Sequence, residues 1–253
     1  MIRNIKTPHL PEGEVRHIII GEKYKNLLEN ALIDNNLRPL WMPDNPYVDE
    51  RLAGHADLSV NKFGENIVVL SKYLQNSELF EQLKALGYKC VIANDTEKPE
   101  YPFDAGLNVC QIDSKLIYNR KSICEELNNQ LEGIIINRID CRQGYTKCAV
   151  CIVDNNSIIT ADRAIADKVK AQGLDVLLVN DGIASLDGFD YGFIGGAAFK
   201  LNRSEIAFTG VIDSLSEKNA IEYFLKQRGI EAVYLTQRKL FDIGSAILIT
   251  ESI

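Results

Sequence analysis

The side chains best suited to chemistry lie in short polar segments that each precede a predicted β-strand. Gly-His-Ala-Asp places His55 two residues before Asp57, and Gly-Tyr-Thr-Lys-Cys ends on Cys148. A thiol paired with an imidazole supports nucleophilic catalysis, in which the histidine moves protons and a carboxylate orients the ring or holds a cation. Taken alone, a cysteine at a strand start is more often a small buried hydrophobic residue. The chemistry therefore depends on a fold that brings the two segments together.

Three further polar segments also precede predicted strands. They are Ala-Gly-Leu-Asn, which ends on Asn108, Ile-Gly-Gly-Ala at 194–197, and Phe-Asp-Ile-Gly-Ser at 241–245, which contains Asp242. Asn108 suits a ligand contact and a hydrogen bond between neighbouring repeats equally well. No phosphate-loop helix follows the glycine pair, so this pair is interpreted as a tight strand entry.

Cys148 and Cys151 have the Cys-x-x-Cys spacing that is also found in redox and zinc sites. Residues three apart on a strand point to opposite faces, which opposes a shared site. The chain also has no second pair with this spacing. The sequence therefore favours separate roles for the two cysteines.

A repeat of strands and helices positions these segments. Its unit is an apolar strand, a turn, a second apolar strand, a helix and a third strand. The second strands are anchored by Ile67, Leu116, Ile158 and Ile206 at steps of 49, 42 and 48 residues, and Ile18 lies 49 residues before Ile67. A period of this kind indicates one supersecondary unit that is used several times.

The repeat predicts the bounds of three elements in each unit from apolar spacing and from helix start and stop signals. The predicted second strands are 16–21, 65–71, 115–119, 157–161 and 205–209. The predicted helices are 22–35, 77–86, 122–131, 163–172 and 216–228, with Ser77 and Ser216 as N-caps. The predicted third strands are 37–42, 90–93, 133–137, 176–179 and 232–236.

The first strands are distributed unevenly along the chain. Complete units begin near Gly54, Asp104, Gly144 and Gly195, whereas the first strand of the fifth unit, at 241–249, ends the chain. The N-terminus supplies the second strand, helix and third strand that this unit lacks. We therefore predict an α/β fold with a closed ring of five ββαβ blades, a propeller whose last blade is completed by both termini, since closure hides strand edges. A three-layer α/β sandwich with one continuous sheet is the alternative.

The composition is that of an ordinary globular protein, and the repeats predict a single domain over 1–253. With 28 basic and 35 acidic residues the net charge is −7, which disfavours nucleic acids and membrane surfaces as partners and favours small cations. No apolar run approaches the about 18 residues of a membrane span, and the N-terminus has no secretory signal. The six cysteines are therefore expected to be reduced, in a cytoplasmic protein. No oligomeric state follows from the sequence.

Taken in cyclic order, the motifs resemble those of the guanidino-group-modifying enzyme (pentein) superfamily, which includes arginine and agmatine deiminases, dimethylarginine hydrolases and amidinotransferases. Those enzymes are five-bladed ββαβ propellers with a Gly-His-x-Asp segment, then an Asn-bearing strand, then Gly-x-x-x-Cys. This chain has matching segments at 54–57, 107–109 and 144–148, with 93 residues between the histidine and the cysteine. In the family the cysteine blade closes the chain, whereas here it is central and Asp-Ile-Gly-Ser at 242–245 lies near the end. The resemblance thus implies a circularly permuted member.

The resemblance implies a deiminase-like cysteine hydrolase that acts on a small guanidino or amidino compound through a covalent thiouronium, with no cofactor and no metal. Cys148 is then the nucleophile, and His55 is the general acid and later the general base. Asp57 orients the histidine or holds the substrate. Asp242 and Asn108 are the implied substrate contacts, and Asp242 accepts guanidinium N–H bonds.

Two details of the match concern charge. The family carries an acidic residue before a glycine where this chain has Ile-Gly-Gly at 194–196, and Asp190 just upstream is the candidate replacement. Lys147 and a cationic substrate are expected to lower the pKa of Cys148 from about 8.5 toward neutrality.

The segments 47–52 and 187–191, which precede the histidine and the fourth complete unit, are predicted to be substrate-gating loops. An amidinotransferase and a pentein-fold protein that binds a small molecule without turnover are the alternative functions. The missing acidic residue of the family pattern favours the binding protein among these two.

Overall fold

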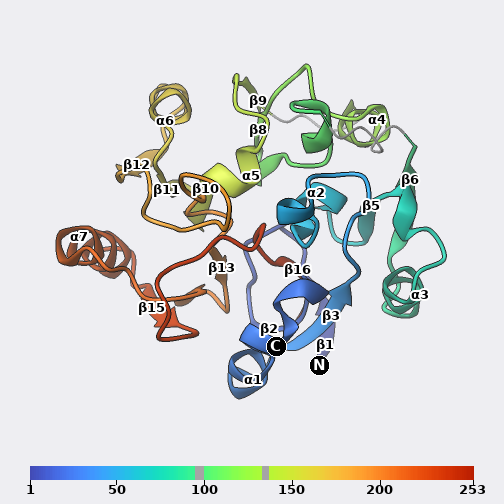
Figure 1. Cartoon of the computed structure of the whole chain (residues 1–253), viewed down its shortest axis with the longest axis horizontal. Helices are drawn as coiled ribbons and strands as arrows, with labels where there is room; N and C mark the ends of the chain where they lie inside the picture. Colours follow the sequence, from blue (N-terminus) through green and yellow to red (C-terminus); the bar gives the residue numbers. More distant parts are fainter. Residues whose placement is uncertain (95–99, 133–136) are drawn as a thin grey trace.

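The structure, a computed structural model, describes residues 1–94, 100–132 and 137–253. In these ranges the strands form five small sheets, which lie around a common centre with the longer helices on the outside (Figure 1). Each sheet holds three or four strands. The alternative of one continuous sheet is therefore wrong for the described part of the chain.

Four of the sheets share one topology, in which the first strand is antiparallel to the second and the second is parallel to the third. Their strands are β4 (Val60–Phe63), β5 (Ile67–Ser71) and β6 (Lys89–Ala93); β7 (Cys110–Ile112), β8 (Lys115–Tyr118) and β9 (Asn137–Asp140); β10 (Val150–Asp154), β11 (Ser157–Thr160) and β12 (Asp175–Leu178); β13 (Ala198–Lys200), β14 (Glu205–Phe208) and β15 (Glu231–Tyr234). The helices between second and third strands are α3 (Glu78–Ala85), α4 (Glu125–Glu132), α6 (Arg163–Lys170) and α7 (Leu215–Lys226). Each of these sheets thus has the predicted order of strand, strand, helix and strand.

The fifth sheet joins the two ends of the chain. Its order is β1 (Ile2–Asn4), β16 (Ile247–Ser252), β2 (Glu14–Gly21) and β3 (Arg38–Met42), so the last strand lies between the first two. β16 is antiparallel to both neighbours, and α1 (Lys25–Asp34) connects β2 to β3. The prediction that the termini complete one sheet is confirmed, although β1 was not predicted.

A buried carboxylate fastens the two ends to each other. Glu251 in β16 accepts hydrogen bonds from Arg3 Nε at 2.9 Å and from the backbone N–H groups of Glu12 and Gly13 at 2.6 and 2.8 Å. Its side chain is fully buried, and hydrogen bonds to a charged group are stronger than those between neutral groups. Glu251 therefore holds the N-terminal arm against the strand that closes the sheet.

Capping sets the helix boundaries. Ser77 caps α3 by accepting a hydrogen bond from the backbone N–H of Phe80, as predicted. In α7 the N-cap is Ser214 rather than the predicted Ser216, because the side chain of Ser214 accepts from the backbone N–H of Glu217. Both serines suit an N-cap position, so the residue type alone did not distinguish them. None of the helices in the described residues is long and apolar enough to span a membrane.

The first strands begin later than predicted because helical or tight turns precede them. The helical turns α2 (Ala56–Ser59) and α5 (Thr146–Ala149) precede β4 and β10. The predicted strand at 241–249 starts only at Ile247, since Gly244 and Ser245 have φ angles of 68° and 61°. Cys148 therefore lies in a helical turn and not at the start of a strand.

Most of the predicted strand at 133–137 lies outside the described residues, because the structure describes nothing between 132 and 137. The third strand of that sheet, β9, runs over Asn137–Asp140 and so begins at the last residue of the predicted range.

Among the described residues, the buried hydrophobic side chains form five clusters, and each cluster joins two neighbouring sheets. Ile159 of β11 packs in one cluster with Ile206 of β14, and Ala207 of β14 packs in the next with Ile18 of β2. Followed from sheet to sheet, the clusters return to the sheet from which they started. The strand entries on the inner side of the sheets are thereby held close to one another.

Candidate functional site

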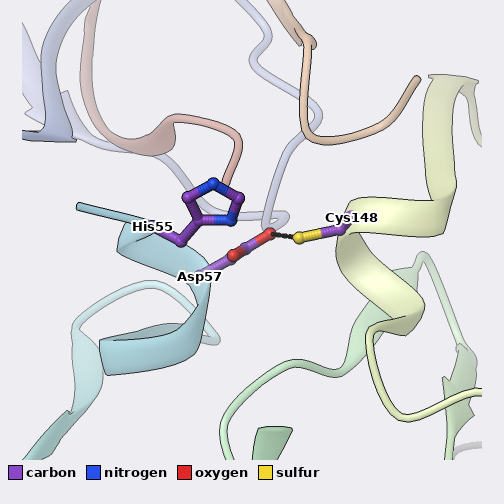
Figure 2. A group of neighbouring side chains, drawn as sticks. All are labelled: His55, Asp57 and Cys148. Carbon is purple, nitrogen blue, oxygen red and sulfur yellow. Dashed lines mark hydrogen bonds between the residues drawn. The ribbon is translucent and has the colours of Figure 1, made fainter. Parts of the chain in front are cut away.

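Two short helical turns bring the predicted thiol and histidine together. His55 is the N-cap of α2, Asp57 lies in the first turn of α2, and Cys148 lies in α5. Asp57 Oδ2 is 2.8 Å from Cys148 Sγ, although 91 residues separate the two in the chain (Figure 2). One nitrogen, oxygen or sulfur atom from each of the three side chains lies within 4.8 Å of the others, and all three residues are buried. The predicted convergence is therefore present in the structure.

Asp57 lies between the imidazole and the thiol (Figure 2). One carboxylate oxygen accepts the hydrogen bond from the thiol, whereas the other, Oδ1, is buried without a hydrogen-bond partner. Burial raises the pKa of Asp57 to about 7, and the charge of Lys147 and the hydrogen bond from Cys148 oppose this increase. The carboxyl group can therefore gain or lose a proton near neutral pH.

The surroundings of His55 favour its neutral form. Burial lowers the pKa of its imidazole, and the charge of Asp242 only partly offsets this effect. Its Nε2 is buried without a hydrogen-bond partner, and the ring of Tyr24 lies 6.4 Å from the imidazole. A Cβ on Gly244 would lie 2.3 Å from the His55 Cβ, so glycine is required there both for space and for its φ of 68°. The ring is thus packed tightly and has an unused nitrogen.

The Cys148 thiol is protonated in the free protein. Burial raises its pKa well above the ordinary value, and the negative charges of Asp57 and Asp242 add to the increase. The Lys147 ammonium donates to Ser245 Oγ at 2.8 Å and to the Gly195 carbonyl at 3.3 Å. The predicted lowering of the Cys148 pKa by Lys147 together with a cationic substrate stays a prediction. Formation of a thiolate therefore requires a positive charge that the free site does not supply.

Asn108 positions the turn that carries the thiol. Its Oδ1 accepts hydrogen bonds from the backbone N–H groups of Lys147 at 2.7 Å and Cys148 at 3.4 Å, and its Nδ2 lies 3.4 Å from Cys148 Sγ. The side chain is buried and links two neighbouring repeats. These contacts match the hydrogen-bonding alternative for Asn108 and leave its predicted substrate contact without support.

Asp242 reaches the same site from the C-terminal segment. Its Oδ1 accepts from the backbone N–H of Gly244 and its Oδ2 from that of Phe193, both at 2.8 Å. A Cβ on Gly196 would lie 1.9 Å from Oδ1, so the carboxylate is packed directly against that glycine. Asp242 therefore fixes the turn beside His55 and contributes negative charge to the site.

Of the predicted site residues, Asp190 is the one that the structure does not bring to the others. It is exposed, and in the described part of the chain it forms no hydrogen bond or ion pair. A carboxylate that the sequence analysis missed is Asp104, which is buried, receives a hydrogen bond from the Tyr145 hydroxyl, and leaves Oδ1 without a partner. Asp104 was noted only as the start of a repeat, and its burial had no signal in the sequence.

A cavity of about 350 Å³ adjoins the site. Asp242 and Tyr24, which lie beside His55, both line it. Around them the lining carries more positive than negative charge. The charged lining residues are Lys23, Arg51, Asp187, Arg238, Lys239 and Asp242. The cavity thus lies beside the site, and its charged lining residues are mostly cationic.

The two predicted gating loops meet at this cavity. Arg51 of the first loop donates a hydrogen bond to the Gly188 carbonyl of the second at 2.6 Å, and its guanidinium lies 4.2 Å from the centre of the Phe189 ring. Arg51 and Asp187 both line the cavity. Contact between these loops is therefore present, while their gating role stays a prediction.

The sequence and the fold of this chain each have matches among known proteins. A family model described as "Family of unknown function (DUF6873)" matches residues 19–247. No curated protein matches the sequence.

Among solved structures, the fold is similar to three enzymes of known chemistry. A dimethylarginine dimethylaminohydrolase variant from Pseudomonas aeruginosa complexed with citrulline has 11% identity, a TM-score of 0.57, and coverage of 93% of this chain and 99% of that chain. The agmatine deiminase of C. jejuni with substrate bound has 8% identity, a TM-score of 0.59, and coverage of 98% and 96%. The inosamine-phosphate amidinotransferase of Streptomyces griseus has 9% identity, a TM-score of 0.57, and coverage of 98% and 97%. The resemblance to the pentein superfamily is confirmed for the fold, and circular permutation stays a prediction.

Proposed function

The chain belongs to a family of unknown function, DUF6873, and from its fold and site we propose that it is a cysteine-dependent hydrolase of a small guanidino or amidino compound. The observation that carries this proposal is the buried contact of Cys148 with Asp57, beside the unpartnered nitrogen of His55. A nucleophile, a proton carrier and a carboxylate for a cation are the groups that hydrolysis of an amidinium carbon needs. The test is the detection of a covalent thiouronium on Cys148 during turnover.

The proposal includes a closed five-bladed propeller that forms a single domain over 1–253. The cycle of hydrophobic clusters supports closure, because every sheet packs on two neighbours. The pairing of β16 with β1 and β2 supports completion of the last blade by the termini. In such a ring the inner strand entries meet on one axis, and the three site residues come from two of these entries.

The first chemical step begins when the substrate cation enters. A guanidinium held by Asp57 and near Asp242 supplies the positive charge that the free site lacks, and this charge lowers the pKa of the Cys148 thiol. The thiol proton passes to neutral His55, one ring nitrogen of which lies within 4.8 Å of the sulfur. The sulfur then attacks the guanidinium carbon, which forms the C–S bond.

The remaining steps use the thiol proton and then a second proton, which comes from water. His55, now protonated, gives its proton to the departing nitrogen as the C–N bond breaks, which leaves a thiouronium on Cys148 and releases ammonia. Neutral His55 then takes a proton from water as that water attacks the carbon. The C–S bond breaks, and the sulfur regains a proton from His55. The ureido product, which still carries the positive charge of the thiouronium, passes its extra proton to the released ammonia, so the products are a neutral ureido compound and ammonium. Each step therefore balances with water as the only co-substrate.

The cavity indicates which guanidino compounds fit. Its lining is cationic, which opposes a ligand that carries only positive charge and attracts an anionic group. A volume of about 350 Å³ lies at the lower end of ligand pockets and suits a molecule of amino-acid size. We therefore propose a substrate with a guanidino or amidino group at one end and a carboxylate or similar anion at the other.

Arg238 provides a test of this charge preference. It lines the cavity and forms no ion pair among the described residues. We expect wild-type protein to act on arginine with a kcat/KM at least about tenfold higher than on agmatine, its decarboxylated analogue. Arg238→Gln is expected to raise the KM for arginine about fivefold and leave kcat nearly unchanged, as loss of a binding contact does.

The matched control for this prediction is Arg163→Gln, which removes an exposed arginine at the start of α6, outside the cavity. Its KM should equal that of the wild type. A preference for agmatine, or an equal change in both variants, would exclude an anion-binding role for the cavity.

A non-catalytic binding protein is the second candidate, and the raised pKa of the Cys148 thiol favours it. The two functions differ in what a bound guanidino compound does to the sulfur. A binder leaves the thiol unmodified at saturating ligand, whereas a hydrolase forms the thiouronium.

A further inference from the structure

A second, smaller cavity lies among four polar side chains outside the proposed catalytic site. His9, Lys147, Lys200 and Ser245 line it together with apolar side chains, and its volume is about 10 Å³. The exposed fraction of each of these four residues is 8% or less. They come from four separate parts of the chain, which are the N-terminal arm, α5, β13 and the segment before β16. A cavity of this volume holds one particle of about the size of a water molecule.

Two of the lining groups are ammonium groups with unused hydrogen-bond donors. Lys147 Nζ donates to Ser245 Oγ at 2.8 Å and to the Gly195 carbonyl at 3.3 Å. Lys200 Nζ donates to the Arg203 carbonyl at 2.9 Å. An ammonium has three donors, so Lys147 keeps one and Lys200 keeps two in the described part of the structure. No acidic residue is among the described residues that line the cavity, although buried charges are normally paired.

Carboxyl groups outside the lining neutralise these ammonium groups only in part. The charge of Lys147 acts on Asp57, but burial raises the pKa of that carboxyl to about 7, so Asp57 is only partly ionised at neutral pH. Burial lowers the pKa of Lys200 to about 8, and the negative groups near it oppose this decrease only partly. The surroundings of the cavity therefore favour an additional negative charge.

A turn of the N-terminal arm brings His9 to the cavity. The Thr7 carbonyl accepts a hydrogen bond from the backbone N–H of Leu10 at 3.1 Å, so Pro8 and His9 occupy the centre of a β-turn. His9 has a φ of 65°, and glycine or asparagine is usual at a turn position with a positive φ. The imidazole forms no hydrogen bond with any residue that the structure describes, so a ring N–H is available to a ligand in the cavity.

We propose that this cavity binds one monatomic anion, chloride, between the ammonium groups of Lys147 and Lys200 and a ring N–H of His9. Sulfate, phosphate and carboxylates are too large for a volume of about 10 Å³. Chloride is somewhat larger than water, and the long, flexible lysine side chains make room for it. The bound anion supplies the missing counter-charge and ties the N-terminal arm to three other segments of the chain.

Water is the other species that fits the volume. A water molecule donates two hydrogens and needs acceptors for them, whereas the free groups of Lys147 and Lys200 are donors. Ser245 Oγ already accepts from Lys147 and donates to the Ala198 carbonyl at 3.4 Å. Two ammonium groups also create a positive potential, which favours an anion over a neutral molecule.

Crystals of the full chain grown in bromide instead of chloride locate the ion directly, because bromide scatters X-rays anomalously. We expect one anomalous peak in the cavity, within hydrogen-bond reach of Lys147 Nζ and the His9 ring. A water molecule at this place, or bromide on the surface as an adventitious ion only, would overturn the proposal.

Thermal unfolding in sodium chloride and in sodium gluconate of equal ionic strength measures binding in solution, because gluconate is too large for the cavity. Chloride at about ten times its Kd should raise the Tm of the wild type by about 3–6 °C relative to gluconate. Lys147→Met removes one ammonium and keeps a long side chain, and it should lose at least about half of this rise. His9→Gly should do the same and keeps the turn, since glycine readily adopts a φ of 65°.

Asn76→Gly is the matched control for His9→Gly, because Asn76 is an exposed residue with the same φ of 65°. Its response to chloride should equal that of the wild type. An equal rise in Tm for the wild type and His9→Gly, or no difference between chloride and gluconate in the wild type, would contradict the anion site. Neither measurement uses turnover, so the anion site stands or falls independently of the proposed hydrolase activity.

Discussion

Replacing Cys148 by serine is expected to abolish the turnover of guanidino substrates while the fold persists. Loss of a covalent nucleophile typically costs about 10⁴-fold or more in kcat, because the hydroxyl is far less acidic than the thiol. Serine can still donate to Asp57 and receive the hydrogen bond from Asn108, so the contacts of the turn are kept. Initial rates of ureido product formation, together with thermal unfolding, measure the two effects separately.

Cys90→Ser is the matched control. Cys90 lies in β6, away from the site, and its side chain is only partly buried. It should keep the wild-type rate. A Cys148→Ser protein that retains more than a tenth of the wild-type rate would assign the nucleophile elsewhere. A variant that no longer folds would make Cys148 a structural residue.

Asp57→Asn is expected to stabilise the protein and to inactivate it. The pKa of Asp57 is raised from 3.8 to about 7, so the protonated form is favoured in the fold. The stabilisation that comes from the raised pKa of Asp57 is fully present below about pH 4, the pKa of an unfolded aspartate. This stabilisation is lost as the pH rises through about 7. Asparagine cannot ionise, so the variant should escape this loss and exceed the wild type in free energy of unfolding at pH 8 by a few kcal/mol.

The same substitution removes the carboxylate that holds the substrate cation beside the thiol. We expect kcat/KM to fall by about 10²–10⁴-fold, the range typical of loss of a group that assists proton transfer. Urea unfolding at pH 5 and pH 8 and steady-state kinetics measure the two outcomes. Asp190→Asn, at an exposed position, should change neither. Equal free energies of unfolding of Asp57→Asn and the wild type at pH 8 would show that burial of the ionised carboxylate does not destabilise the protein.

The repeats could be predicted because each contains long periodic elements. The second strands coincide with runs of apolar residues. The spacing of these runs, 42 to 49 residues, indicates the repeating unit from the sequence alone. The helical turns α2 and α5 had no such signal, since four residues are too few for a helical period. The late start of β16 depends on the positive φ angles at Gly244 and Ser245, which follow from the packing of this turn on His55.

The site was predicted as far as the order of the repeats determines it. That order brings His55, Asp57 and Cys148 together, as the structure shows. The electrostatics of the free site differ from what the sequence suggested, because they depend on where the charged ends of the side chains lie. Lys147 is adjacent to Cys148 in sequence, yet its ammonium lies at Ser245, and the cationic lining of the cavity comes from segments far apart in the chain.

Intact-mass analysis of protein quenched in acid during turnover tests the proposed mechanism most directly. With arginine in excess we predict a covalent adduct of substrate less ammonia, mapped by peptide analysis to Cys148. The adduct should be absent from Cys148→Ser and greatly slowed in His55→Gln, which lacks the group that takes the thiol proton and protonates the leaving nitrogen. A protein that consumes or binds arginine at saturation with every cysteine unmodified, or with the adduct on another cysteine, would contradict the account.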